Sequence, residues 1–285
     1  MASPFKKLAV RNWRWIRDQW LGYLPAIDFA TIYPAPMLWD LPDFGRNLGE
    51  TRKEGVIAYI PGVREAIFRE AIILARKLLY CWSVTHAVAA RGRQTWTSIA
   101  AYEASFYGAK AFCYLHGFAS LGRDSKFYLD AFHRTEIRIR RGERSERVIE
   151  LDLEIYNLQS RMEHSTLWAI TERLLNTTIF EPDLAATQSA LKRIDWSKYS
   201  TFRNRVMYVG PFWPLSRTLE ECDLTREYCH PEILRALDPT QDSVPPFSEE
   251  YFTVAKLIRE ALHLMVADLA SLAPALTLEA GALRP

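Results

Sequence analysis

Apolar residues recur at steps of three and four along most of the chain, which is the spacing of one face of an α-helix. The pattern predicts helices over 5–21, from Pro61 to just before Gly92, from about 95 to Gly117, from about 160 onward, over 183–194 and from Ser248 to about 274. A short connection around Gly92 joins the second helix to the third, so we expect these two to form an antiparallel pair. The fold class that follows is mainly α, a helical bundle.

The period changes to two between about 135 and 156. Ile137 and Ile139 alternate with Arg138 and Arg140, and apolar residues then alternate with acidic ones in the second half of the segment. Period two is typical of β-strands, and the region of Gly142 supplies the turn. We therefore predict a β-hairpin over about 135–156, inserted into the helical protein.

Proline and glycine set the expected organisation of the remaining segments. They recur between 22 and 55, which predicts an extended connection, and the apolar residues of this segment indicate that it packs on the body. Residues 1–55 are thus expected to form an N-terminal helix and an extended segment packed on a helical body of residues 56–274. Residues 275–285 are expected to form a loose tail.

The predicted N-terminal helix has two different faces. Phe5, Ala9, Trp13, Ile16 and Trp20 share one face, and basic residues occupy the other surface. We expect the tryptophan face to pack on the core, as most amphipathic helices do. A basic helix rich in tryptophan also suits a membrane surface or nucleic acid, and both remain alternatives at this stage.

Composition is that of an ordinary globular protein. The 285 residues are 49% hydrophobic and 25% charged, and the formal net charge is +2. This balance excludes a general polycation but leaves local charged patches open. Neither a signal peptide nor a membrane-spanning apolar run is visible in the sequence, so we expect a soluble cytoplasmic protein without a transmembrane segment.

The cysteines do not form a recognisable metal-binding pattern. Cys81 and Cys113 lie in apolar helical segments, whereas Cys222, Cys229 and His230 lie near one another without a CxxC pair. We expect free buried thiols, with a zinc site at the second group as the alternative. Phosphate-loop, dinucleotide-binding and HExxH motifs are absent from the sequence. No cofactor and no metal are therefore expected.

The hairpin carries the clearest local charge in the sequence. Residues 134–147 contain six arginines and three glutamates, a net charge of +3. We expect Arg138 and Arg140 to be neutralised by the acidic residues of the second strand, which are Glu150, Asp152 and Glu154. Arg141, Arg144 and Arg147 lie nearer the turn, and we expect them to meet phosphate or an acidic protein partner.

The helix before Gly117 carries a family resemblance. Residues 100–118 read AAYEASFYGAKAFCYLHGF, which resembles the AYYAxFHAARALLLLxG helix of the HEPN superfamily. These are small all-α domains that are common in prokaryotic toxin and defence systems. Independently of the resemblance, Ala101, Ser105 and Gly108 form a seam of small residues that lets another helix approach closely.

The resemblance implies a site for metal-independent RNA cleavage. Ribonuclease members of the superfamily carry an arginine, four to six further residues and then a histidine. Arg203 and the polar Asn204 match the start of that motif, but Tyr208 stands where the histidine is expected. Arg203 would stabilise charge on the phosphate. Tyr208 would be a poor base near neutral pH because the pKa of an ordinary tyrosine is about 10.

Two functions follow as expectations. One is a HEPN-like protein of a prokaryotic defence or antiviral system that binds RNA or cleaves it as a metal-independent ribonuclease. The other is a non-catalytic subunit that docks on a larger protein complex. Either reading implies that the chain works as an oligomer or a complex subunit, with RNA or a protein as its partner. The six histidines are scattered, and none is assigned a role.

Overall fold

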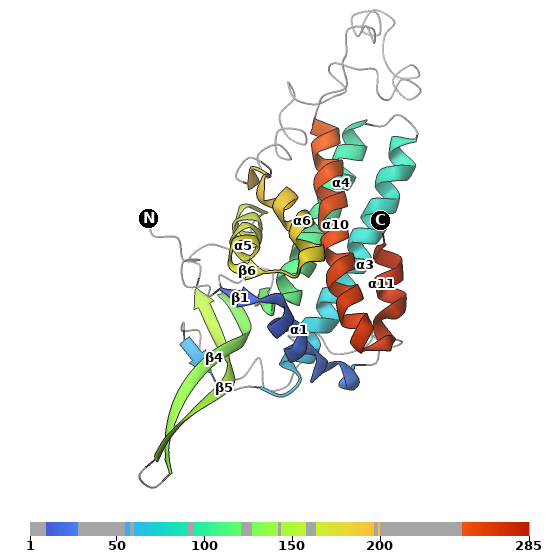
Figure 1. The fold of residues 1–285 in the computed structure, drawn as a ribbon. Coiled ribbons are helices and arrows are strands. Elements are labelled where there is room, and N and C mark those ends of the chain that lie inside the picture. The colour runs from blue at the N-terminus through green and yellow to red at the C-terminus, as the bar shows by residue number, and fades with distance from the viewer. Residues whose placement is uncertain are drawn as a thin grey trace, which may run out of the picture.

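The computed structural model describes residues 10–27, 55–57, 60–90, 94–120, 127–141, 144–157, 164–196, 199 and 247–284. Three long helices lie side by side in it (Figure 1), α3 (Val63–Ala89), α4 (Gln94–Leu115) and α10 (Phe247–Leu272). Shorter elements pack around them: α1 (Trp13–Leu21), η2 (Leu24–Ala26), α5 (His164–Thr177), α6 (Pro182–Lys192), η7 (Pro274–Leu276) and α11 (Thr277–Leu283). The prediction of a mainly α fold is confirmed.

Small residues set the close packing of the three long helices. A Cβ atom added to Gly108 of α4 would lie 2.4 Å from Cδ1 of Leu78 on α3 and 2.5 Å from Cγ2 of Ile258 on α10. Ala101 and Ser105 of the same helix are fully buried. Because any side chain at position 108 would collide with both neighbours, the glycine allows α4 to lie between the other two helices.

The N-terminal helix packs through its tryptophan face. Trp13, Ile16 and Trp20 have no exposed surface. The indole Nε1 of Trp20 donates to the carbonyl oxygen of Leu115 at 2.7 Å, and that of Trp13 donates to Asp268 Oδ2 at 2.8 Å. This face is therefore part of the core, which leaves no apolar face of α1 to enter a membrane.

The hairpin is longer than its alternation predicts and belongs to a sheet. The strands β4 (Phe127–Arg141) and β5 (Arg144–Asn157) pair antiparallel, and β3 (Phe118–Ser120) and β2 (Gly55–Ile57) flank them in the order β2-β5-β4-β3. A separate parallel pair joins β1 (Arg11–Asn12) to β6 (Thr178–Ile179). Figure 1 shows the β4–β5 hairpin extending away from the bundle, with only its base against the body.

The strand register corrects the expected pairing of charges. Arg138 lies opposite Arg147, and Arg140 lies opposite Ser145. Glu150 and Asp152 lie opposite Thr135 and His133, while Glu154 lies opposite Asp130. The physical reason is geometric, because the register runs outward from the pair Arg141 and Arg144, so that residues equally distant in sequence from this pair lie opposite each other. The arginines are nearer the turn than the acids are, so the two groups do not face each other.

The prediction for the segment after Pro274 is also corrected. It forms η7 and α11 rather than a loose tail, and it buries Leu276 and Leu283 against the body. Arg76 of α3 is ion-paired with Glu279, and the Arg259 guanidinium donates to the carbonyl oxygen of Leu283 at 3.0 Å. The bundle therefore includes the C-terminal helix. Among the described residues, no helix is long and apolar enough to cross a membrane.

Candidate functional site

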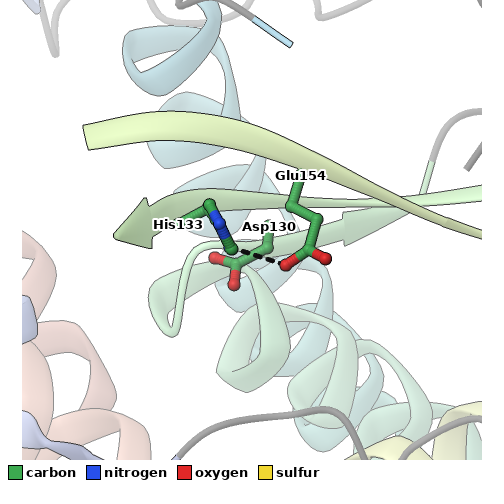
Figure 2. Close-up of side chains that lie close together, drawn as sticks. All are labelled: Asp130, His133 and Glu154. Carbon is green, nitrogen blue, oxygen red and sulfur yellow. Dashed lines mark ion pairs between the residues drawn. The ribbon is translucent and has the colours of Figure 1, made fainter. Parts of the chain in front are cut away.

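The base of the hairpin holds a cluster of charged and polar side chains. The register shifts by one residue between Asp130 and His133, so that two residues of β4 lie opposite one residue of β5. Such a bulge turns the strand locally and re-aims the side chains next to it. It brings Asp130, His133 and Glu154 together, with their ligand-forming atoms within 4.8 Å of one another (Figure 2).

Asp130 is a buried carboxylate that Arg11 neutralises. The aspartate side chain is 1% exposed, and both of its oxygens accept hydrogen bonds from the Arg11 guanidinium of β1. The backbone N–H of Phe132 also donates to Asp130 Oδ1 at 3.0 Å. Burial disfavours the charged form of Arg11, but the adjacent Asp130 outweighs this effect and the pKa of Arg11 is raised above its ordinary value. This ion pair links β1 to the base of the hairpin.

His133 and Glu154 form a second, more accessible pair. His133 Nδ1 lies 2.6 Å from Glu154 Oε2, and the two side chains are 26% and 19% exposed. The hydroxyl of Tyr156 donates to the same carboxylate oxygen. Burial, followed by this hydrogen bond, raises the pKa of Tyr156, so the hydroxyl keeps its proton and remains a donor. The carboxylate of Glu154 is thus held from two sides.

The cluster does not have the geometry of a resident metal centre. Both oxygens of Asp130 are already bonded to Arg11, which supplies the positive charge that a metal ion would bring. The separation of 2.6 Å between the His133 nitrogen and the Glu154 oxygen is that of a hydrogen bond. Two ligands on one tetrahedral zinc ion stand about 3.3 Å apart. The arrangement is therefore an ion-paired network with one imidazole at its exposed edge.

A second histidine, His116, is part of the hydrophobic core. His116 is 1% exposed and lies among the rings of Trp13, Phe112 and Phe180. Its Nδ1 is 2.7 Å from the carbonyl oxygen of Phe112, which requires Nδ1 to carry the hydrogen. Burial, with a smaller contribution from the charge of Arg11, lowers the pKa of His116 to about 4. This histidine is neutral and enclosed, whereas the side chain of His133 is 26% exposed.

A groove of about 600 Å³ lies between α1, the start of α6 and α10. Arginines and acids line it in nearly equal numbers, and Arg17 is ion-paired with both Asp18 and Asp268. The groove is therefore lined by charges of both signs.

The structure places only some of the residues that the sequence singled out. Arg141 ends β4, Arg144 begins β5 opposite it, and Arg147 lies three residues further along β5. Arg203, Asn204 and Tyr208 lie outside the described residues, as do Cys222 and Cys229. The predicted RNA-cleavage site and the zinc alternative therefore stay predictions. Of the other two cysteines, Cys113 is buried and Cys81 half-buried, both as free thiols.

Sequence reasoning missed the pair formed by His133 and Glu154. Two features of the sequence could have pointed to this pair. His133 directly precedes the arginine-rich segment, and the alternation of apolar and acidic residues in β5 places Glu154 on the same face as the other acidic residues. The sequence pattern does not reveal the bulge in β4, and this bulge brings the two side chains together.

Comparison with known proteins gives no relative for this arrangement. The chain matches no protein-family model, no curated protein and no solved structure.

Proposed function

We propose that this chain is a HEPN-like helical protein that binds RNA through the outer end of the β4–β5 hairpin. The observation that carries the proposal is the strand register, which sets Arg138 opposite Arg147 and Arg141 opposite Arg144. Residues directly opposite in an antiparallel pair have Cβ atoms about 5 Å apart, and like charges at such positions destabilise the pair. Bound phosphate would remove that repulsion.

The hairpin is long enough to follow several nucleotides. From His133 to Arg141 the strand advances eight residues, about 27 Å at the usual rise of a β-strand. Its base is fixed, since Leu129, Leu153 and Ile155 have no exposed surface. A long positively charged ribbon on a rigid base is suited to following a polyanion.

The resemblance of residues 100–118 to the HEPN helix favours RNA over an acidic protein as the partner. Residues 100–118 resemble the HEPN helix, and α4, which covers most of that segment, packs against both α3 and α10 at the centre of the bundle. The resemblance thus concerns the central helix of the bundle. Binding by an acidic protein partner is the alternative, and the same experiment tests it.

The test is RNA binding measured by fluorescence anisotropy at several salt concentrations. We expect the variant Arg141→Glu/Arg144→Glu/Arg147→Glu to bind single-stranded RNA more weakly, with the largest loss at low salt. The slope of log affinity against log salt concentration should become shallower by about 2, because each lost phosphate contact on a single strand removes roughly 0.7.

A matched control changes the same charge elsewhere. Arg14, Lys192 and Arg193 are exposed on α1 and at the end of α6, and reversing all three to glutamate alters the net charge by the same amount. The proposal predicts a much smaller loss of RNA binding for this control. If both variants lose binding equally, general charge rather than the hairpin is responsible. If the wild-type protein binds no RNA and the hairpin variant instead releases a protein partner, the docking function is the correct one.

A further inference from the structure

The strand register divides the outer hairpin into two faces of different composition. Directly opposite residues of an antiparallel pair share a face, and successive residues of one strand alternate between the faces. One face, which we call the arginine face, carries four arginines against a single acid: Arg134, Arg138, Arg140, Arg147 and Glu136. The other, the mixed face, carries two arginines and three acids around three aliphatic residues, which are Ile137, Ile139 and Val148.

The aliphatic residues of the two faces differ in their surroundings. On the arginine face, the apolar residues of β5 continue into Leu153 and Ile155, which have no exposed surface at the base. On the mixed face they lie toward the turn, in the part of the hairpin that projects from the bundle (Figure 1). Among the described residues, β2 and β3 pair with the sheet only at its base. Because an isolated two-stranded hairpin is at best marginally stable in water, covering one face favours such a projection.

The charges of the mixed face are ordered along the hairpin. Arg141 and Arg144 form the row next to the turn, whereas Glu150 and Asp152 lie in the two rows nearest the base. Rows on one face are two residues apart, which is about 7 Å at the usual rise of a strand. The mixed face is therefore basic at its outer end and acidic at its inner end, with the aliphatic rows between them.

This order makes the mixed face complementary to a reversed copy of itself. A two-fold axis across the strands, lying between two such faces, sets the basic end of each copy on the acidic end of the other. We propose that two copies of this chain associate through the mixed faces of their hairpins, packed face to face and pointing in opposite directions. The arginine faces then lie on the outside of the pair, so the association does not compete with phosphate there and does not depend on RNA binding.

The positions of the charges select one alignment of the two copies. An alignment that sets Arg144 on Asp152 of the other copy also sets Glu146 on Glu150, and like charges across an interface disfavour it. Shifting by one row sets Arg144 on Glu150 instead. Glu146 then meets Val148, and the aliphatic residues of the two β4 strands meet each other. The contact to be tested is therefore the one between Arg144 and Glu150 of the other copy, which occurs twice in the symmetric pair.

The size of the mixed face sets the expected strength of the dimer. The face runs from His133 to Arg141, about 27 Å at the usual rise of a strand, and it is only two strands wide. Interfaces smaller than about 1,200 Å² belong to weak and transient assemblies. We therefore expect a reversible dimer with a Kd in the micromolar range, which sedimentation velocity at several protein concentrations measures.

The test exchanges the two charges in nuclease-treated, full-length protein. We expect wild-type protein to show a monomer–dimer equilibrium. Arg144→Glu and Glu150→Arg should each raise the Kd of the dimer by at least about tenfold, because each sets like charges together at both symmetric contacts. An equimolar mixture of the two variants should dimerise again, because both contacts of the mixed dimer then join opposite charges. The double variant Arg144→Glu/Glu150→Arg should dimerise like the wild type for the same reason.

The mixture also separates an interface from an effect on folding. A chain that fails to fold is not rescued by a second such chain, and thermal melting followed by circular dichroism checks each variant. Arg193→Glu and Glu172→Arg give the matched control, since they reverse exposed charges at the end of α6 and on α5. These two variants should leave the Kd of the dimer unchanged, both separately and in a mixture.

Several results would overturn the proposed dimer. Wild-type protein that stays monomeric well above micromolar concentration rejects it, as does dimerisation that neither single variant weakens. Folded single variants that remain monomeric when mixed reject the two-fold arrangement. Association seen only before nuclease treatment assigns the contact to bridging nucleic acid. A dimer that binds no RNA rejects the proposed function alone, and a monomer that binds RNA rejects the dimer alone.

Discussion

The two ends of the β4–β5 hairpin use charged residues in opposite ways. At the base, Asp130 is 1% exposed and is fully engaged by Arg11, while Glu154 is bonded by His133 and Tyr156. Toward the turn, the register places arginine opposite arginine. Charges at the base therefore form ion pairs within the fold, whereas toward the turn the register makes residues of like charge cross-strand partners.

The largest effect on stability is expected at the base of the hairpin. Removing Arg11 with Arg11→Ala leaves the buried carboxylate of Asp130 without its counter-charge, and we expect a loss of about 3–5 kcal/mol in the free energy of unfolding. Urea denaturation measures it. Arg14→Ala, an exposed arginine on the neighbouring helix, is the control and should change stability by less than about 0.5 kcal/mol. Equal effects would mean that the ion pair contributes little.

A comparable loss is expected where α1 meets the core. Trp13→Ala removes a fully buried indole and its hydrogen bond to Asp268, which should lower stability by about 3–5 kcal/mol. Unchanged thermal stability together with lost liposome binding would instead assign the helix to a membrane surface. A chemical denaturation curve and a vesicle sedimentation assay on the same protein distinguish the two results.

The buried histidine beside the hairpin base should make the fold sensitive to acid. The pKa of His116 is about 4 in the folded protein and about 6.5 when unfolded, so the unfolded state binds more protons between these values. Stability should therefore fall as the pH drops from about 6.5 to about 4, by up to about 3 kcal/mol. In His116→Leu, which cannot be protonated, that part of the pH dependence should disappear from the denaturation midpoints. A persistent slope would assign the acid sensitivity to other groups.

The smallest effect, and the sharpest contrast, is expected nearer the turn. Arg138→Glu converts the like-charge pair with Arg147 into an opposite-charge pair, which should stabilise the hairpin by about 0.2–1 kcal/mol. The same change should weaken RNA binding. A variant that gains stability while losing affinity would support the view that this part of the hairpin is built for a ligand. A loss of both would contradict it.

Much of the secondary structure could be predicted from local pattern. The apolar stripe of α3 and the tryptophan face of α1 are buried as their spacing indicates, because a helix buries the residues that recur every three or four positions. Gly108 marked the close helix contact, since few other reasons place glycine within a long helix. Alternation likewise identified the two strands of the hairpin.

Only the tertiary structure decided which side chains meet. Arg11 and Asp130 are 119 positions apart in the sequence, and no local period connects them. The bulge between Asp130 and His133 brings His133 to Glu154, and the position of the turn sets arginine opposite arginine rather than opposite acid. A periodic pattern reports which face of an element is buried. It does not report register, because a one-residue shift preserves the alternation along each strand while it changes every cross-strand neighbour.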